Sequence, residues 1–380
     1  MNPDARPGRI GAIDTLRGIV MALMLVDHVR EFFFLHRQVA DPMLLADTPA
    51  DLFVTRLLAH LCAPVFVFLT GLGAWLHGQR GGASPRDTAA YLFKRGLLLI
   101  ALELTLINFA WTFTLPPKVI YLQVIWAIGL SMIALAALLR LPRQALLALG
   151  LVIVFGHNLL DGLHFPAGHP AHVPWAILHD RGMIELGDAL RARTSYPVLP
   201  WIGVILLSYA TGPLYRGGMA PGRRQRILFL LGTTALGLFG VLRLANVYGD
   251  QPRSVGPTGL DTLMSFFNLT KYPPSLLFIL LTLGIGLLGL AWLERCRAWD
   301  VAARFGQVPL FFYAIHLYLL HLLHLACTVV FGHNQGSRFG FDVVWQVWLL
   351  ALTVLVLLGP LCQWFAGVKR RSPGGWVSYF

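Results

Sequence analysis

Apolar stretches of about 20 residues recur along this chain and alternate with short polar segments. Each is long enough to cross the hydrocarbon layer of a membrane. Because backbone groups in lipid must form their hydrogen bonds within the segment, we expect these stretches to be helices. The pattern predicts an all-α, polytopic membrane bundle of about ten helices. The expected spans are residues 13–35, 52–77, 91–114, 119–139, 144–160, 198–215, 226–246, 274–294, 307–331 and 342–366.

Composition supports this class and adds a topology. The 380 residues are 56% hydrophobic and only 13% charged, against about 25% charged in soluble domains. The net charge is +12, and the basic residues concentrate in alternate loops. The positive-inside rule therefore places both termini in the cytoplasm. A nucleic-acid partner is not needed to explain the charge. We expect residues 1–380 to form one transmembrane domain, with the first apolar stretch retained as a helix.

Two outer loops, at about 161–197 and 247–273, are long for simple connectors. The first has no obvious secondary structure in its sequence. Loops of this length are often functional or act as lids. The four cysteines do not have metal-type spacing, and a disulfide framework is not expected.

The first span carries ionisable side chains in an ordered pattern. Each costs roughly 2.5–3.5 kcal/mol at the centre of a membrane helix, so we expect them to face protein or a watery cavity. Arg17 and His28 are about three helical turns apart and share a face with Asp14. Asp14 and Arg17 are spaced to form an ion pair, or Arg17 faces an anionic cosubstrate. Asp27 is spaced to pair with Arg30 and is a further candidate for the catalytic group.

Other spans also contain polar residues. His60 is expected at nearly the same depth as His28, on a neighbouring antiparallel helix, and both are candidate catalytic residues. Candidate substrate-binding residues are Glu103, Trp201, Tyr313 and His316. The sequence lacks a nucleophile elbow, a phosphate loop and a dinucleotide fingerprint, and no metal site is expected. A neutral imidazole suits deprotonation of a hydroxyl or amine, so the pattern favours direct acyl transfer with histidine as general base.

A different class of function would use the same residues. Buried Asp, Glu and His side chains are also typical of a proton relay, so a proton-coupled transporter or flippase is the alternative. The absence of a strong internal repeat counts modestly against it.

Several motifs resemble the heparan-alpha-glucosaminide N-acetyltransferase-like membrane family, within the wider transmembrane acyltransferase group. Those nearest the N-terminus are Ile13-Asp14-Thr15-Leu16-Arg17-Gly18, Asp27-His28-Val29-Arg30 and Ala59-His60-Leu61-Cys62-Ala63-Pro64. Segments 196–203, 271–275 and 305–316 resemble its bacterial branch. The resemblance is densest over residues 9–215. The Arg17–His28 interval also resembles an Arg-x10-His signature of the wider group, in which that histidine is the presumed base.

The resemblance implies an enzyme of the bacterial inner membrane that takes acetyl-CoA or another acyl-CoA from the cytosol. The acceptor would be a sugar or other envelope molecule at the outer face. Besides Asp14 and Arg17, candidates to hold the donor are the basic residues Arg80, Arg86, Lys94 and Arg95. Lysosomal relatives carry Asn at the position of His28 and place their catalytic His in the following loop. Here that loop offers His36, so the base is His28 or His36, and its place in the bundle favours His28. The acceptor, the acyl chain and the oligomeric state are not implied.

Overall fold

The structure is a computed structural model that describes residues 11–37, 39–79, 84–296 and 299–372. It is mainly helical and divides into two compact units. Unit 1 comprises 1–36, 220–233 and 285–380, and unit 2 comprises 37–219 and 234–284. Two helices, α10 (Pro221–Ala245) and α12 (Leu276–Leu293), contribute residues to both units.

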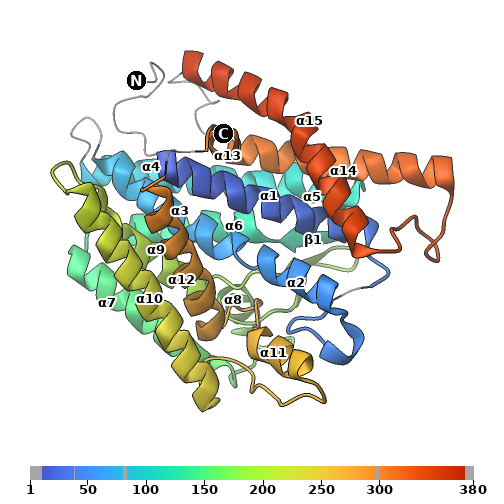
Figure 1. The fold of residues 1–380 in the computed structure, drawn as a ribbon, viewed down its shortest axis with the longest axis horizontal. Coiled ribbons are helices and arrows are strands. Elements are labelled where there is room, and N and C mark those ends of the chain that lie inside the picture. The colour runs from blue at the N-terminus through green and yellow to red at the C-terminus, as the bar shows by residue number, and fades with distance from the viewer. Residues whose placement is uncertain (1–10, 38, 80–83, 297–298, 373–380) are drawn as a thin grey trace. The chain divides into compact units, whose positions relative to one another are not determined.

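Unit 1 joins the two ends of the chain. Helix α1 (Gly11–Phe33) contacts α13 (Asp300–Gly306), α14 (Pro309–Phe331) and α15 (Val344–Arg371), which are the blue and the orange-to-red helices of Figure 1. The closest approach is between backbones. A Cβ atom added to Gly18 would lie 1.8 Å from the carbonyl oxygen of Ala302, and one added to Gly306 would lie 1.9 Å from that of Asp14. Two glycines of the sequence motifs therefore allow α1 and α13 to touch.

Unit 2 contains a bundle of shorter helices. Its N-terminal half is formed by α2 (Ala50–Ala59), α3 (Cys62–Gly78), α4 (Pro85–Leu102), the π-helical turn η2 (Glu103–Ile107) and α5 (Asn108–Thr112). The next helices are α6 (Val124–Leu138), α7 (Arg143–Gly156), the 3-10 turn η3 (His157–Leu160), α9 (Leu199–Thr211) and the 3-10 turn η4 (Gly212–Tyr215). Helix α4 packs on α6, while α3, α6 and α7 all pack on α9.

A small sheet and short helices correct two expectations for unit 2. The predicted span 119–139 begins as strand β1 (Val119–Leu122), because its β-branched and aromatic residues pair in parallel with β3 (Arg191–Thr194). The antiparallel strand β2 (Met183–Glu185) completes the order β1-β3-β2. The outer loop 161–197 thus has secondary structure of its own, including α8 (His172–Leu178). The other loops contain η1 (Leu45–Asp47) and α11 (Gly259–Phe267).

The chain is a membrane protein. In the part of the chain that the structure describes, six helices are long and apolar enough to cross a bilayer. They are Ala50–Gly78, Arg143–Leu160, Pro221–Ala245, Leu276–Leu293, Pro309–Phe331 and Val344–Arg371. Two shorter apolar helices occur at Val124–Leu138 and Leu199–Tyr215. The count of about ten spans and the position of the termini remain predictions, and so does the single-domain assignment.

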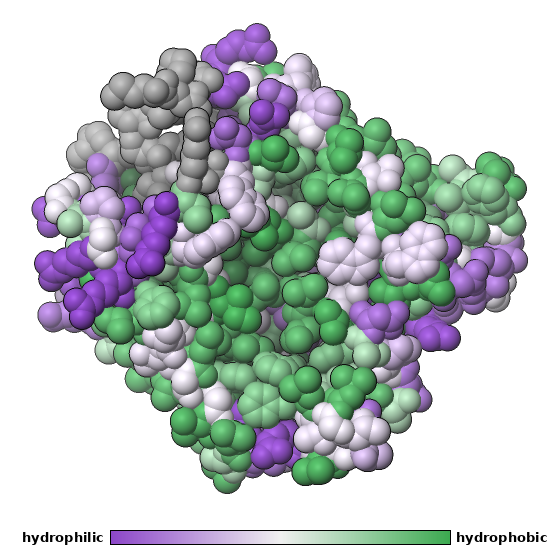
Figure 2. Space-filling view, viewed as in Figure 1, coloured by the Kyte–Doolittle hydropathy of each residue, from purple (hydrophilic) through white to green (hydrophobic). Residues whose placement is uncertain are grey.

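The surface of the long helices fits a lipid environment. Large apolar side chains are exposed along α15, where water would be an unfavourable neighbour. They include Trp345, Leu349, Leu352, Val356, Leu357, Leu361 and Trp364. Figure 2 shows that apolar side chains cover much of the visible surface.

Candidate functional site

The central feature of unit 1 is a contact between two histidines. Nδ1 of His28, on α1, lies 2.6 Å from Nε2 of His316, on α14. The two rings are stacked, with centroids 4.9 Å apart and an interplanar angle of 12°. The other ring nitrogen of His316, Nδ1, lies 2.7 Å from the carbonyl oxygen of Phe312, one helical turn earlier. His316 is fully buried, so its hydrogen bonds are made with protein groups.

These contacts determine which nitrogen carries each proton. A carbonyl oxygen can only accept, so Nδ1 of His316 donates to Phe312. In a neutral imidazole the other nitrogen is an acceptor, so Nε2 of His316 accepts from Nδ1 of His28. The lone pair of neutral His28 is therefore on Nε2. The chain of hydrogen bonds holds His28 in the tautomer that can take a proton through that nitrogen.

Tyr313 packs against both imidazoles. Its ring is edge-on to those of His28 and His316, with centroids 5.7 Å away in each case. Its side chain is 3% exposed, so it forms an apolar wall beside the pair. Tyr313 and His316 therefore lie on the side of α14 that contacts His28. Their assigned role in binding substrate stays a prediction.

Asp27 is engaged elsewhere. Its Oδ1 accepts a hydrogen bond from Nε of Arg30 at 3.1 Å, as the i, i+3 spacing predicts, and Arg30 also pairs with Glu31. Arg30 is 3% exposed, so the ion pair with Asp27 is largely shielded from solvent. The observed pair neutralises a buried arginine, and a catalytic role for Asp27 stays a prediction.

The other ionic pair of α1 forms at its opposite end. Nη1 of Arg17 donates to Oδ1 of Asp14 at 3.1 Å and to the carbonyl oxygen of Gly306 at 2.9 Å. Gly306 is the last residue of α13, so Arg17 satisfies a carbonyl at a helix C-terminus. The spacing-based ion pair is confirmed, and binding of an anionic cosubstrate by Asp14 and Arg17 stays a prediction.

The two other candidate histidines lie in different surroundings. His36 follows the end of α1 in an exposed turn, and its ring tilts against that of Phe34 at 4.8 Å. His60 ends α2 in unit 2, is 2% exposed, and packs against the ring of Phe278 at 5.2 Å. The predicted closeness of His28 and His60 therefore concerns residues of different units and stays a prediction.

Glu103 and Trp201 are both buried in unit 2. Oε2 of Glu103 accepts a hydrogen bond from the backbone N–H of Trp126 at 3.0 Å, in the first turn of α6. A carboxylate at a helix N-terminus satisfies a donor that the helix itself leaves unpaired. Trp201 lies in the first turn of α9 and is fully buried, and its Nε1 has no hydrogen-bond partner among the described residues. Substrate binding by either residue stays a prediction.

Three of the basic residues proposed for the donor lie on α4. Arg86 and Lys94 are exposed, while Nη1 of Arg95 donates to the hydroxyl of Tyr91 at 2.8 Å. Arg80 lies outside the described residues. The exposed cations Arg86 and Lys94 fit either the positive-inside rule or an anionic ligand.

Two motif segments also meet in unit 2. The hydroxyl of Tyr272 donates to that of Tyr196 at 3.2 Å. The backbone N–H of Lys271 donates to the Asp41 carboxylate at 3.1 Å. Burial raises the pKa of Asp41 above its ordinary value, although the positive charges of Arg56 and Lys271 oppose that shift. This cluster attaches the segment after α1 to the start of α12.

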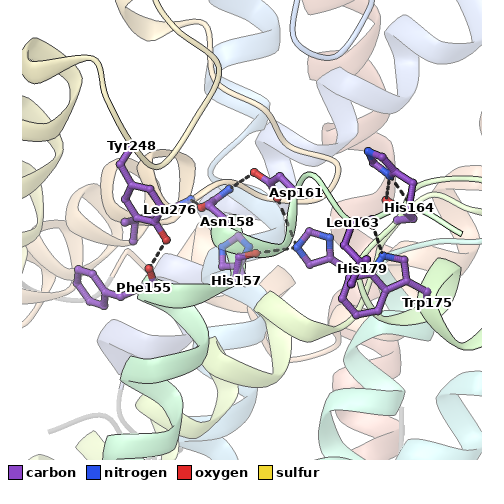
Figure 3. Close-up of polar contacts among 11 residues, drawn as sticks. Phe155, His157, Asn158, Asp161, Leu163, His164, Trp175, His179, Tyr248 and Leu276 are labelled. Carbon is purple, nitrogen blue, oxygen red and sulfur yellow. Dashed lines mark hydrogen bonds and ion pairs between the residues drawn. The ribbon is translucent and has the colours of Figure 1, made fainter. Parts of the chain in front are cut away.

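Two polar features were missed by sequence reasoning. Arg243, near the end of α10, is 2% exposed and donates to four backbone carbonyls, those of Gln251, Ser265, Phe266 and Asn268. The second is a cluster of His157, Asp161 and His179 in unit 2, drawn in Figure 3. The i, i+4 spacing of His157 and Asp161 was an available signal for it, whereas no signal in the sequence indicates the carbonyl partners of Arg243.

Comparison with known proteins identifies the family. A search of curated proteins gave no match. The family described as "Heparan-alpha-glucosaminide N-acetyltransferase, catalytic" matches residues 9–240. The matched region contains His28 and His60 and ends before His316. Because it spans more than half of the chain, this membrane protein belongs to the heparan-alpha-glucosaminide N-acetyltransferase catalytic family, and it is an acyltransferase.

Proposed function

We propose that the protein transfers an acetyl or other acyl group from cytosolic acyl-CoA to a sugar or envelope acceptor at the outer face of the bacterial inner membrane. His28 is the general base. The observation that carries this proposal is the hydrogen-bond chain from His28 through His316 to the Phe312 carbonyl, which leaves the lone pair of His28 on Nε2.

The reaction needs one proton acceptor and no protein nucleophile. The hydroxyl or amine of the acceptor attacks the thioester carbonyl, and Nε2 of His28 takes the proton that the acceptor loses. The tetrahedral adduct then expels the CoA thiolate, breaking the C–S bond, and the proton on His28 passes to that sulfur. His316 is a positioning residue, because it holds Nδ1 of His28 in the donating role.

The donor is assigned to the opposite end of α1. Asp14 and Arg17 lie there, and the exposed cations Arg86 and Lys94 are on α4. The positive charges of Arg17, Arg86 and Lys94 suit the phosphates of CoA. With both termini cytoplasmic, Arg17 would be near the cytosol and His28 nearer the outer face. The thioester end of the donor would therefore extend along α1 to reach the acceptor beside His28.

A direct test uses the purified full-length protein, radiolabelled acetyl-CoA and a membrane extract that supplies acceptors. Wild type should label an acceptor, and His28→Ala should lower the rate by about 10²–10⁴-fold. His321→Gln is a matched control on α14 and should retain activity. Equal rates for wild type and His28→Ala would remove His28 as the base.

Two further comparisons separate His28 from His36 as the base, and an enzyme from a transporter. Loss of labelling in His36→Ala, with His28→Ala active, would assign the base to the turn after α1. Movement of a substrate across vesicles without consumption of acyl-CoA would favour a transporter instead. The family membership supports the enzyme.

A further inference from the structure

We propose that His157, Asp161 and His179 form a binding site for a divalent transition-metal ion of the zinc type. The three side chains each offer one ligand atom, and these atoms all lie within 4.8 Å of one another. Two imidazoles and one carboxylate are a donor set that Zn²⁺ accepts, and a fourth position would remain open to water or another ligand. All three residues belong to unit 2.

The distances between the ligand atoms suit a metal ion if the three side chains move slightly closer together. Nε2 of His179 lies 3.4 Å from Oδ1 of Asp161. Two ligands on a tetrahedral zinc, with bonds of about 2.1 Å, are about 3.4 Å apart, so this pair already has the required separation. The ligand atoms of all three residues lie within 4.8 Å of one another, so only a small movement would bring them to that separation.

Several buried ring nitrogens of the cluster lack a hydrogen-bond partner among the described residues. His157 is 2% exposed, and neither of its ring nitrogens has a hydrogen-bond partner in the described structure. His179 is 1% exposed, and its Nδ1 likewise has no partner there. Buried polar atoms without partners cost about 1–3 kcal/mol each, and a metal bond to each imidazole would offset part of that cost.

The surroundings favour a cation. Asp161 also accepts a hydrogen bond from Nδ2 of Asn158 at 2.8 Å, which orients its carboxylate (Figure 3). The carboxylates of Asp180 and Asp250 add negative charge near Asp161. The Asp161 side chain is 46% exposed, which gives an ion a path from solvent to the buried imidazoles.

One existing contact competes with the metal for a ligand atom. Nε2 of His179 lies 2.9 Å from the backbone carbonyl oxygen of His157 and donates to it in this structure. If Nε2 bound the metal, its proton would move to Nδ1, which is unpartnered within the described residues. If Nδ1 bound the metal, the bond from Nε2 to the carbonyl would fix the ring orientation, as is common for metal-bound histidines.

Such an ion would join separate parts of the outer loop. His157 follows α7, Asp161 begins the loop, and His179 follows α8. The ring of Trp175 stacks on His179 at 5.2 Å and its Nε1 donates to the carbonyl of Leu163 (Figure 3). A metal would therefore hold α8 against the end of a membrane-spanning segment.

The test measures metal binding independently of activity. The full-length protein is purified through a tag without histidine, stripped with chelator, and titrated with Zn²⁺ and with Co²⁺. Wild type should bind one equivalent, show the visible absorption of four-coordinate Co²⁺, and gain thermal stability with Zn²⁺. Asp161→Asn and His179→Gln should each weaken binding by at least about 10-fold.

A control variant and a folding check separate loss of the metal site from general damage to the protein. His164→Gln removes an exposed histidine of the same loop, which pairs with Asp180, and should bind zinc as wild type does. Because Asp161→Asn retains the shape of a partly exposed side chain, its failure to bind would not reflect unfolding if its melting temperature without metal equals that of wild type. Absence of a stoichiometric ion in wild type, or equal affinity in all variants, would overturn the proposal.

Discussion

His28 and His316 are 288 residues apart in sequence, yet their ring nitrogens lie 2.6 Å apart. The contact joins a helix from the N-terminal end of the chain to one from the C-terminal third. Hydrogen bonds then run from His28 to His316 and from His316 to the Phe312 carbonyl, which fixes the nitrogen that carries the proton on each ring. A histidine with a fixed tautomer is what a general base requires.

The role of His316 can be separated from that of substrate binding. His316→Phe retains an aromatic ring but removes the acceptor for Nδ1 of His28, so the wrong tautomer of His28 becomes accessible. We expect kcat to fall by at least about 10-fold, less than in His28→Ala, with little change in KM for acyl-CoA. A rise in KM with an unchanged kcat would contradict a positioning role and favour direct binding.

The contact between α1 and α13 depends on glycine. Gly18→Ala places a Cβ atom 1.8 Å from the Ala302 carbonyl oxygen, so the helices must separate. We expect destabilisation of at least about 1–3 kcal/mol, seen as a lower melting temperature in detergent. Gly289→Ala is the matched control. Its Cβ would meet only a Leu16 methyl at 3.7 Å, so its stability should equal or slightly exceed that of wild type.

We expect Glu103 to stabilise the start of α6 through the hydrogen bond that its carboxylate oxygen accepts. Glu103→Ala leaves the N–H of Trp126 without its acceptor in a buried position and should cost about 1–3 kcal/mol. Glu103→Gln keeps a carbonyl oxygen that can accept the same bond, so its melting temperature should fall less. Equal losses in both variants would show that the negative charge, rather than the acceptor, is required.

Asp41 gives a pH dependence with a defined sign. Burial raises the pKa of Asp41 in the folded protein above its ordinary value of 3.8, so the folded state binds the proton more tightly than the unfolded state. Its contribution to stability is full below pH 3.8 and is lost as pH rises through the raised pKa. Wild type should therefore gain melting temperature relative to Asp41→Asn on acidification through that window. A constant difference across pH would contradict the shifted pKa.

Arg243 is expected to hold the second outer loop in place. Arg243→Lys keeps the charge but cannot make the branched set of bonds to carbonyls on both sides of the loop. The loop should open more often, and limited trypsin digestion should cut faster after Arg253, whose Nε donates to the Arg243 carbonyl. Arg226→Lys, at an exposed site on the same helix, should leave the cleavage rate unchanged.

Properties that depend on neighbours in sequence could be predicted without a structure. Hydropathy over about 20 residues identifies a helical membrane protein, because a bilayer excludes backbone that is not hydrogen-bonded within its own segment. Helix periodicity likewise predicted the pairs Asp14–Arg17 and Asp27–Arg30, since residues three apart share a face. The family motifs also follow from sequence, and the family is confirmed.

Relationships between distant segments required the tertiary structure. Val119 lies in an apolar stretch that fits a helix, and only its pairing with β3 makes it a strand. In the sequence His316 is a candidate for substrate binding, and its contact with His28 forms only because α14 packs against α1. His157 likewise lies near His179 only because of the path of the loop between them. Local sequence determines which side chains a helix presents, while packing and loop paths decide which of them meet. For that reason the sequence offered His28 as a candidate base, and only the tertiary structure placed His316 against it.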